Sequence, residues 1–108
     1  MKVDLTQPLT QIDGSPLLED GKPVLARTVC ARALVGDLEE DKGKPESKIT
    51  RFRLAEKIME AQGSIDIDLE DIDVIEKRIE QGFTTTVFVR VKRIFDQARS
   101  KASNEQEA

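Results

Sequence analysis

The chain has 108 residues, of which 38% are hydrophobic and 35% charged, so we expect one small domain with a modest core. Its 17 basic and 21 acidic residues leave a formal charge of −4, whereas free nucleic-acid-binding proteins are more often basic. No apolar run approaches the roughly 18 residues of a membrane-spanning helix, and the N-terminal MKVDLTQPLTQID lacks the apolar core of an export signal. These features argue against a membrane partner and favour the cytoplasm.

The sequence contains no histidine, which excludes Ser-His and Cys-His catalysis and most zinc sites. Cys30 is the only cysteine, so no internal disulfide can form, and a reducing cytoplasm suits it. It lies in the apolar run VCARALV, where we interpret it as a small buried hydrophobe. We therefore expect a protein that is not an enzyme and that holds neither a metal nor a cofactor.

The first 25 residues predict a β-hairpin. Val3 and Leu5 alternate with polar neighbours, as in a strand with one buried face. Two Asp-Gly turn dipeptides follow, the second of them at Asp20-Gly21. The segment 21–25 would then return as a second strand paired with the first.

Two helices are predicted between residues 28 and 63. The first is short, with Thr28 as its N-cap and Gly36 at its end. Residues 37–44 are mostly charged and predict an exposed, mobile loop. Pro45 suits the first turn of the second helix. Apolar residues then recur at spacings of three and four, which predicts a buried stripe of Ile49, Phe52, Ala55, Ile58 and Met59.

The segment 64–82, SIDIDLEDIDVIEKRIEQG, changes its apolar period partway along. Alternation predicts a short strand over 64–67, which could lie beside the hairpin. The helical spacing of the following isoleucines predicts a helix over about 69–81, with Asp68 as its N-cap and Gly82 at its end.

The last element begins with TTTVFVRV at residues 84–91, which has strong β-propensity. Helical spacing also fits and continues through KRIFDQARS, so a helix capped by Thr84 or Thr85 is favoured over a strand. The polar residues 100–108 predict a disordered tail. The fold class is therefore α+β: a single domain over 1–99, with an N-terminal hairpin packed against about four short helices.

Acidic residues crowd the 64–82 segment. They define a candidate acidic contact face of Asp66, Asp68, Glu70, Asp71, Asp73 and Glu76. An EF-hand loop that starts at Asp66 would put Asp71 where glycine is needed and Lys77 where a bidentate glutamate is needed. The same carboxylates fall on the polar side of a strand and in the first turn of a helix, where negative charge is favourable without any catalytic role. Mimicry of nucleic acid is a further interpretation, disfavoured by the 17 basic residues.

The last helix carries a candidate basic contact face of Arg90, Lys92, Arg93 and Arg99. Such a helix could contact phosphates or enter a DNA groove, although neither helix-turn-helix spacing nor stacking aromatics accompany it. The opposed acidic and basic faces favour association with a protein partner or with further copies of the chain. Neutralisation of one face by the other within the molecule explains them equally well.

Five stretches occur in a recognisable order over about residues 1–98: MKVDLTQPL, the Ile12-Asp13-Gly14 turn, VCARALVG, RFRLAEKIMEAQG and IDIDLEDIDVIEKRI. In this order the chain resembles a group of small phage and prophage proteins of unknown function. The resemblance implies phage origin and action in the cytoplasm of a bacterial host, and it assigns no site residue. The TTTVFVRVKR run departs from that group, where a less β-branched helix start is expected.

From the residues and this resemblance we expect a non-enzymatic interaction or accessory protein that binds and modulates a host or virion protein. Self-association into a homo-oligomer is a second form that the interaction could take. The alternative function is a nucleic-acid-associated regulator that uses the basic C-terminal helix.

Overall fold

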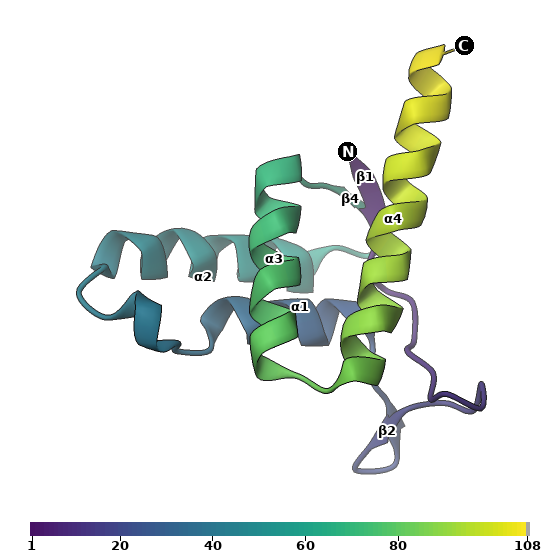
Figure 1. Ribbon diagram of the computed structural model, residues 1–108, viewed down its shortest axis with the longest axis horizontal. Coiled ribbons are helices and arrows are strands. Elements are labelled where there is room, and N and C mark those ends of the chain that lie inside the picture. Colours follow the sequence, from purple (N-terminus) through teal and green to yellow (C-terminus); the bar gives the residue numbers. More distant parts are fainter. Residues whose placement is uncertain (108) are drawn as a thin grey trace.

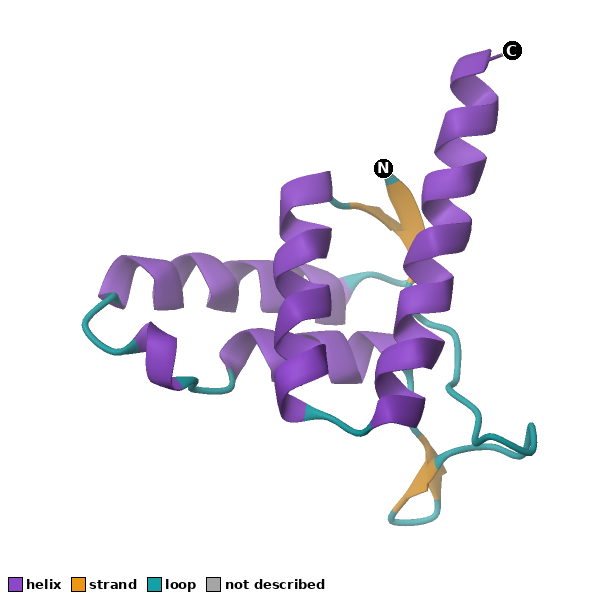
Figure 2. Cartoon of the chain, in the orientation of Figure 1, coloured by secondary structure: helices purple, strands orange, loops and turns teal. Residues whose placement is uncertain are grey.

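The structure, a computed structural model, describes the backbone of residues 1–107 and the side chains of residues 1–102. In chain order its elements are β1 (Lys2–Asp4), β2 (Leu18–Glu19), β3 (Lys22–Pro23), α1 (Ala26–Val35), the 3-10 turn η1 (Glu39–Asp41), α2 (Pro45–Glu60), β4 (Ser64–Asp66), α3 (Leu69–Gly82) and α4 (Thr85–Glu107). Helices dominate and the strands are short (Figure 2). This is the α+β class that the sequence predicts.

The helices form two crossed pairs (Figure 1). α1 and α2 run antiparallel side by side, and α3 and α4 form a second pair that crosses them steeply. α1 packs against both α2 and α3, so it lies at the centre of the helical arrangement. β1 lies against α4, where it closes one end of the core.

The N-terminal strand does not pair with the segment that the sequence predicts. β1 pairs antiparallel with β4, with Val3 opposite Ile65, so the strand expected near 64–67 is the true partner. The predicted pairing with 21–25 is wrong for β1. In that segment β3 has only two residues and includes Pro23, which lacks a backbone donor, and it pairs with β2 across the Asp20-Gly21 turn.

The core is aliphatic, as the composition predicts. The isoleucines of α3 that recur at helical spacing, Ile72, Ile75 and Ile79, are fully buried. They meet buried leucine and valine side chains from the N-terminal segment and α1. Phe95 of α4 is the one buried aromatic residue among the described side chains, and it has no exposed area.

α1 begins earlier than the sequence predicts and without a side-chain cap. Its first residue is Ala26 and its N-cap is Leu25, so the prediction of Thr28 as N-cap is wrong. The N–H groups of Ala26 and Arg27 donate to the carbonyls of Gln7 and Leu5 in the N-terminal segment. Because backbone acceptors already satisfy these donors, the helix needs no capping side chain there.

α4 is helical from its start. This confirms the prediction of a helix over residues 84–91, which the sequence favours over a strand. Thr84 precedes the helix and accepts from Val87 N at 3.5 Å and, through its carbonyl, from Phe88 N at 3.0 Å. The structure differs from the predicted disordered tail, because the backbone of 100–107 continues the helix. The sequence contains neither glycine nor proline after Gly82 to stop it. Residue 108 lies outside the described residues.

Candidate functional site

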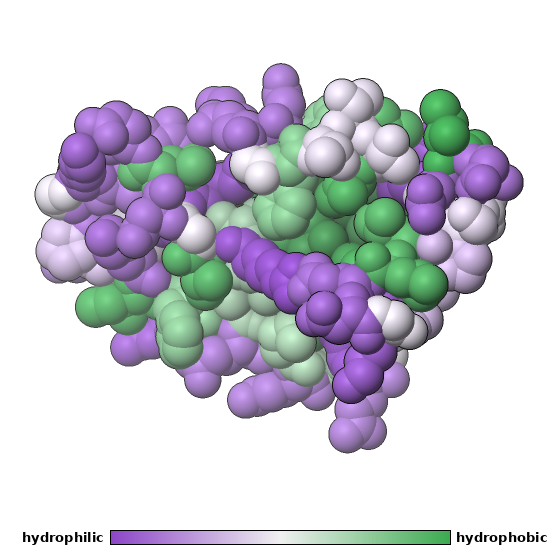
Figure 3. Space-filling view, turned by 90° about the horizontal axis from the view of Figure 1, so that it is seen from below, coloured by the Kyte–Doolittle hydropathy of each residue, from purple (hydrophilic) through white to green (hydrophobic). Residues whose placement is uncertain are grey.

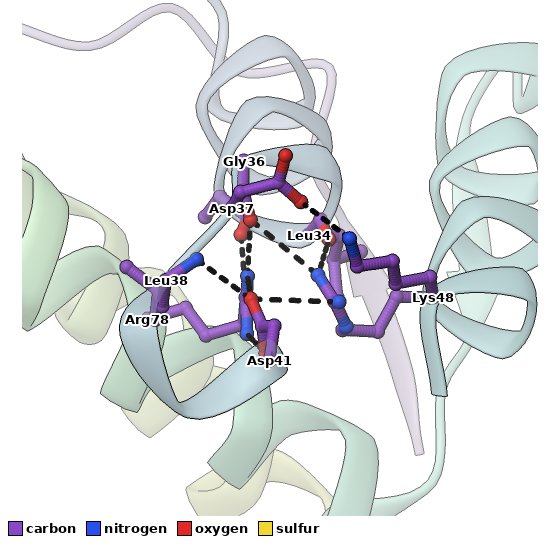
Figure 4. Close-up of polar contacts among 9 residues, drawn as sticks. Leu34, Gly36, Asp37, Leu38, Asp41, Lys48 and Arg78 are labelled. Carbon is purple, nitrogen blue, oxygen red and sulfur yellow. Dashed lines mark hydrogen bonds and ion pairs between the residues drawn. The ribbon is translucent and has the colours of Figure 1, made fainter. Parts of the chain in front are cut away.

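Three charged residues are buried among the described side chains: Asp41, Arg51 and Arg78, here called the buried charge cluster. They come from three separate elements, η1, α2 and α3, and meet at the C-terminal end of α1 (Figure 4). Asp41 lies in the 37–44 segment, so the prediction that this whole segment is exposed is wrong. Only 5% of Asp41 is exposed.

Asp41 closes its own turn and holds Arg78 at the same time. One carboxylate oxygen accepts from Leu38 N at 2.8 Å, which fixes η1. The two oxygens accept from Nη1 and Nη2 of Arg78 at 3.0 and 2.9 Å, a bidentate pair. The Arg78 guanidinium holds the pKa of the Asp41 carboxyl well below its usual range, and the Leu38 hydrogen bond acts in the same direction.

Arg78 also binds the end of α1. Its Nε donates to the carbonyl of Ala33 at 2.6 Å, and its Nη2 donates to the carbonyl of Gly36. The last carbonyls of a helix have no partner within the helix, and a cation there is favoured by the helix dipole. One side chain of α3 therefore satisfies the end of α1 and fixes the 3-10 turn that follows it.

Arg51 is the less neutralised member of the cluster. Its Nη1 donates to the carbonyl of Leu34, while its Nη2 lies 3.5 Å from Asp41 Oδ2. Within the described residues, Nε and Nη2 of Arg51 are buried and make no hydrogen bond. Two buried cations therefore share one carboxylate, which leaves the cluster with a net positive charge.

A cavity of about 430 Å³ adjoins the cluster between η1, α2 and α3. Its apolar walls are Leu34, Leu54 and Val74, and its charged and polar lining consists of Glu40, Asp41, Lys44, Ser47, Thr50, Arg51, Asp71 and Arg78. Lys44 and Ser47 belong to the N-terminal end of α2 and are exposed. The cavity thus joins apolar walls to a region where buried positive charge is in excess.

The candidate acidic face is not gathered into one pocket. Asp66 contacts the Met1 amino group at 2.6 Å, and this group holds the pKa of the Asp66 carboxyl below its usual range. Asp73 and Glu76 are paired with a basic residue of α4, and Asp71 lines the cavity. Asp68 and Glu70 are exposed. Asp68 occupies the N-cap position of α3, but its side chain makes no capping bond, so that part of the prediction is wrong.

The candidate basic face is largely engaged within the molecule. Arg90 donates to the carbonyls of Thr10 and Gln11 at 3.1 and 2.7 Å, and this contact fixes the N-terminal loop on α4. Lys92 lies 3.3 Å from Asp96. Arg93 is exposed.

Arg99 joins the two candidate faces directly. It contacts Glu76 at 2.7 Å, Asp96 at 2.9 Å and Asp73 at 3.2 Å. The Glu76 carboxylate raises the pKa of the Arg99 guanidinium above its ordinary value. The sequence left open whether the acidic face neutralises the basic face within the molecule. Arg99 of α4 and the carboxylates of Asp73 and Glu76 on α3 do neutralise one another in this way.

A second surface consists of exposed apolar side chains on the α1–α2 pair. We call Val35, Ile49, Phe52 and Met59 the α1–α2 apolar face. Of the stripe that the sequence predicts as buried on α2, Ala55 and Ile58 are buried, but Ile49, Phe52 and Met59 are exposed, and Arg51 is buried beside the first two. Phe52 is 55% exposed. Seen from below, the left end of the molecule, where α2 and the end of α1 lie, is mostly hydrophilic with separate hydrophobic spots, and the larger hydrophobic area lies at the centre (Figure 3).

Other chemistry-bearing groups are few. Burial raises the pKa of the Cys30 thiol to about 12, so the thiolate form is strongly disfavoured. Within the described residues, no three Cys, Asp or Glu side chains come together in an arrangement that could hold a metal ion. No helix in the described part of the chain is both long and apolar enough to cross a membrane.

Sequence reasoning missed the buried charge cluster, although part of its signal is present. Arg78 lies between Ile75 and Ile79, on the side of α3 that the isoleucines bury, and Arg51 lies four residues before the buried Ala55. A charged residue on the apolar side of a predicted helix indicates a buried ion pair. Asp41 has no such signal, because its neighbours are all charged or polar.

Comparison of the chain with family models, with curated proteins and with solved structures gave no match.

Proposed function

We propose that this protein is a non-enzymatic interaction protein that contacts a protein partner through the α1–α2 apolar face. The observation that carries the proposal is the exposure of Ile49, Phe52 and Met59 on a helix whose opposite side is already buried. At 100° per residue these three side chains lie within about a quarter of the helix circumference. Ile49 and Phe52 are neighbours on this side, and Met59 lies about two turns beyond Phe52, past the exposed Glu56.

Val35 is a further exposed apolar residue, at the end of α1. It follows Leu34, whose carbonyl is bound by Arg51, so the end of α1 and the N-terminal half of α2 are in contact here. Clustered exposed hydrophobic residues with a polar rim are typical of protein-binding surfaces. Lys48, Arg53 and Glu56 are exposed on α2 and supply that rim. Phe52 is the natural anchor, because aromatic residues dominate binding energy at such surfaces.

The expected partner is a different protein rather than a second copy. A stable homodimer buries about 800 Å² per subunit, with an interface more apolar than ordinary surface. Four half-exposed side chains among charged neighbours form a smaller contact, suited to a partner that contributes its own apolar pocket. If the resemblance to phage and prophage proteins holds, that partner is a host or virion protein met in the bacterial cytoplasm.

The candidate charged faces do not carry this proposal. Three of the four basic residues, Arg90, Lys92 and Arg99, already contact groups of the same molecule, which also weakens the alternative of a nucleic-acid-associated regulator. The remaining exposed charges, such as Arg93 and Glu70, are free to orient an encounter.

The test is a comparison of two single substitutions in the full chain. A partner recovered with the wild-type protein is purified and titrated against the wild type, Phe52→Glu and Ile12→Glu. Ile12 is 91% exposed in the N-terminal loop, away from α2, so it controls for added charge and lost surface hydrophobicity. We expect Phe52→Glu to weaken binding by about a hundredfold, and Ile12→Glu by less than about twofold.

Equal affinities for the two variants would overturn the proposal. Failure of the wild-type protein to recover a stoichiometric partner would also overturn it. So would a stable dimer, measured by light scattering, that dissociates when Phe52→Glu is introduced, because the same face would then be a homodimer interface.

A further inference from the structure

We infer that the cavity between η1, α2 and α3 binds the carboxyl terminus of a polypeptide that ends in an aliphatic residue. The cavity opens on the side of α2 that carries Ser47, Thr50 and Leu54, whereas the α1–α2 apolar face lies on another side of the same helix. The inference therefore goes beyond the proposed function and concerns a separate site.

The first argument is charge. Arg78 takes both oxygens of Asp41, which leaves Arg51 with a single contact of 3.5 Å to that carboxylate. Arg51 is more than nine-tenths buried, and two of its donor atoms make no hydrogen bond within the described residues. A buried cation with unmet donors is costly, and a second carboxylate is the group that would satisfy it.

The second argument is the entry to the cavity. Lys44 and Ser47, which lie at the start of α2, are exposed and line the cavity. Lys44 is the N-cap residue of α2, and it makes no side-chain capping bond. The helix start therefore adds unsatisfied backbone donors and a favourable dipole to the charges of Lys44 and Arg51.

The third argument separates a peptide end from other anions. Three cations line the cavity (Lys44, Arg51 and Arg78), and three carboxylates line it as well (Glu40, Asp41 and Asp71). A doubly charged phosphate would be repelled by the two carboxylates that no arginine holds. A peptide terminus instead carries one negative charge together with backbone N–H groups, which Glu40 and Asp71 can accept.

The fourth argument is the apolar lining. Leu34, Leu54 and Val74 form walls beside the cluster, and Val74 is exposed on its outer side. A C-terminal residue carries its side chain and its carboxylate on the same carbon, so both groups fit a cavity with adjoining apolar and cationic parts. Lys44 at the exposed edge makes the first contact with the carboxylate, and Arg51 lines the cavity behind it.

The experiment is an NMR titration of the full chain with three peptides. The probes are acetyl-Ala-Ala-Ala-Leu with a free carboxyl terminus, the same peptide as its C-terminal amide, and acetyl-Ala-Ala-Asp-Leu-amide, whose only carboxylate is on a side chain. We expect saturable amide shifts over residues 44–54 and 71–78 with the free acid. The two amidated peptides should bind at least about tenfold more weakly.

Two exposed lysines provide matched variants. Lys44→Glu should weaken binding of the free-acid peptide by about tenfold, whereas Lys42→Glu, two residues away and outside the cavity, should change it by less than about twofold. Equal binding of the acid and the amide, equal effects of the two lysine variants, or shifts confined to other regions would overturn the inference. Tighter binding of the internal aspartate peptide would assign the cavity to acidic side chains instead. None of these outcomes depends on Phe52, so the proposed function is tested separately.

Discussion

Asp41 shows how much one carboxylate does in this small domain. It caps its own 3-10 turn, forms a bidentate pair with Arg78 and partly neutralises Arg51. Helix α1 packs on α2 and α3 through the apolar core, but η1 itself contributes no apolar residue to that packing. The carboxylate thereby holds the η1 segment on the end of α1.

Replacement of Asp41 should therefore cost far more than its place in a charged segment suggests. We expect Asp41→Asn to lower the free energy of unfolding by about 3 kcal/mol, because it leaves two buried guanidinium groups without a counter-charge. Urea unfolding followed by circular dichroism measures the change. Glu39→Gln in the same turn is the control, and should stay within about 0.5 kcal/mol since Glu39 is 86% exposed. Similar effects of the two substitutions would contradict this role of the cluster.

The same carboxylate predicts a dependence of stability on pH. Pairing holds the pKa of Asp41 in the folded protein below the ordinary value of 3.8, so the unfolded chain takes up the proton first on acidification. The stabilisation is complete well above pH 3.8 and is lost as the pH falls from there toward the folded pKa. The gap in unfolding free energy between wild type and Asp41→Asn should thus be constant from about pH 7 to about pH 5 and narrow below about pH 4. A gap that widens on acidification would show that Asp41 is not the titrating group.

At the scale of elements, ion pairs determine how α3 and α4 meet. Arg99 contacts Glu76 at 2.7 Å, and 27% and 15% of their side chains are exposed, which places this pair between a surface and a buried salt bridge. Arg99 also contacts Asp73 and Asp96, and these two contacts already restrict the conformation of its side chain without Glu76. Restricted partners lose less side-chain entropy on pairing than two free surface residues do.

A double-mutant cycle measures this contact. We expect Glu76→Gln and Arg99→Gln to show a coupling energy of about 1 kcal/mol, which falls in about 1 M salt because charge interactions are screened. The Glu39–Lys42 pair within one exposed turn is the comparison, with a coupling near zero. If the two cycles give the same coupling, the α3–α4 pair contributes nothing beyond an ordinary surface ion pair.

The positions of the helices and strands could be predicted from the sequence better than the segments with which they pair. The change from alternating to helical period identifies β4 and α3 within one segment, because that information is local. The partner of β1 is not local: Val3 and Ile65 are brought together only by the intervening helices. The start of α1 was missed for the same reason, since distant carbonyls of Leu5 and Gln7 replace the expected cap.

The same distinction between local sequence pattern and contacts of distant segments applies to the candidate sites. The charged faces were visible in the sequence, but only the structure shows that Arg99 neutralises Glu76 and Asp73. In α2, spacing predicts one apolar stripe but cannot say how much of its width the neighbouring helices cover. Ala55 and Ile58 are buried in the core, and Phe52 is left outside it.

At the scale of the whole molecule, the fold is a flat arrangement of two crossed helix pairs, with extents of 42, 39 and 24 Å. A domain of this size has a total stability of roughly 5–15 kcal/mol. Because the core is otherwise aliphatic, Phe95 is its largest fully buried side chain. It is placed on α4, so the packing of the second helix pair on the core depends on it.

Two phenylalanines of this chain therefore give opposite predictions for the same substitution. Phe95→Ala should lower the free energy of unfolding by about 3–5 kcal/mol, because it removes a fully buried ring and leaves a cavity that the crossed helices cannot close. Phe52→Ala should change it by less than about 0.5 kcal/mol, since the ring is half exposed. Urea unfolding of both variants beside the wild type measures the contrast. A large loss at Phe52 would mean that the α1–α2 apolar face contributes to the fold itself, and that its exposure is no sign of a partner.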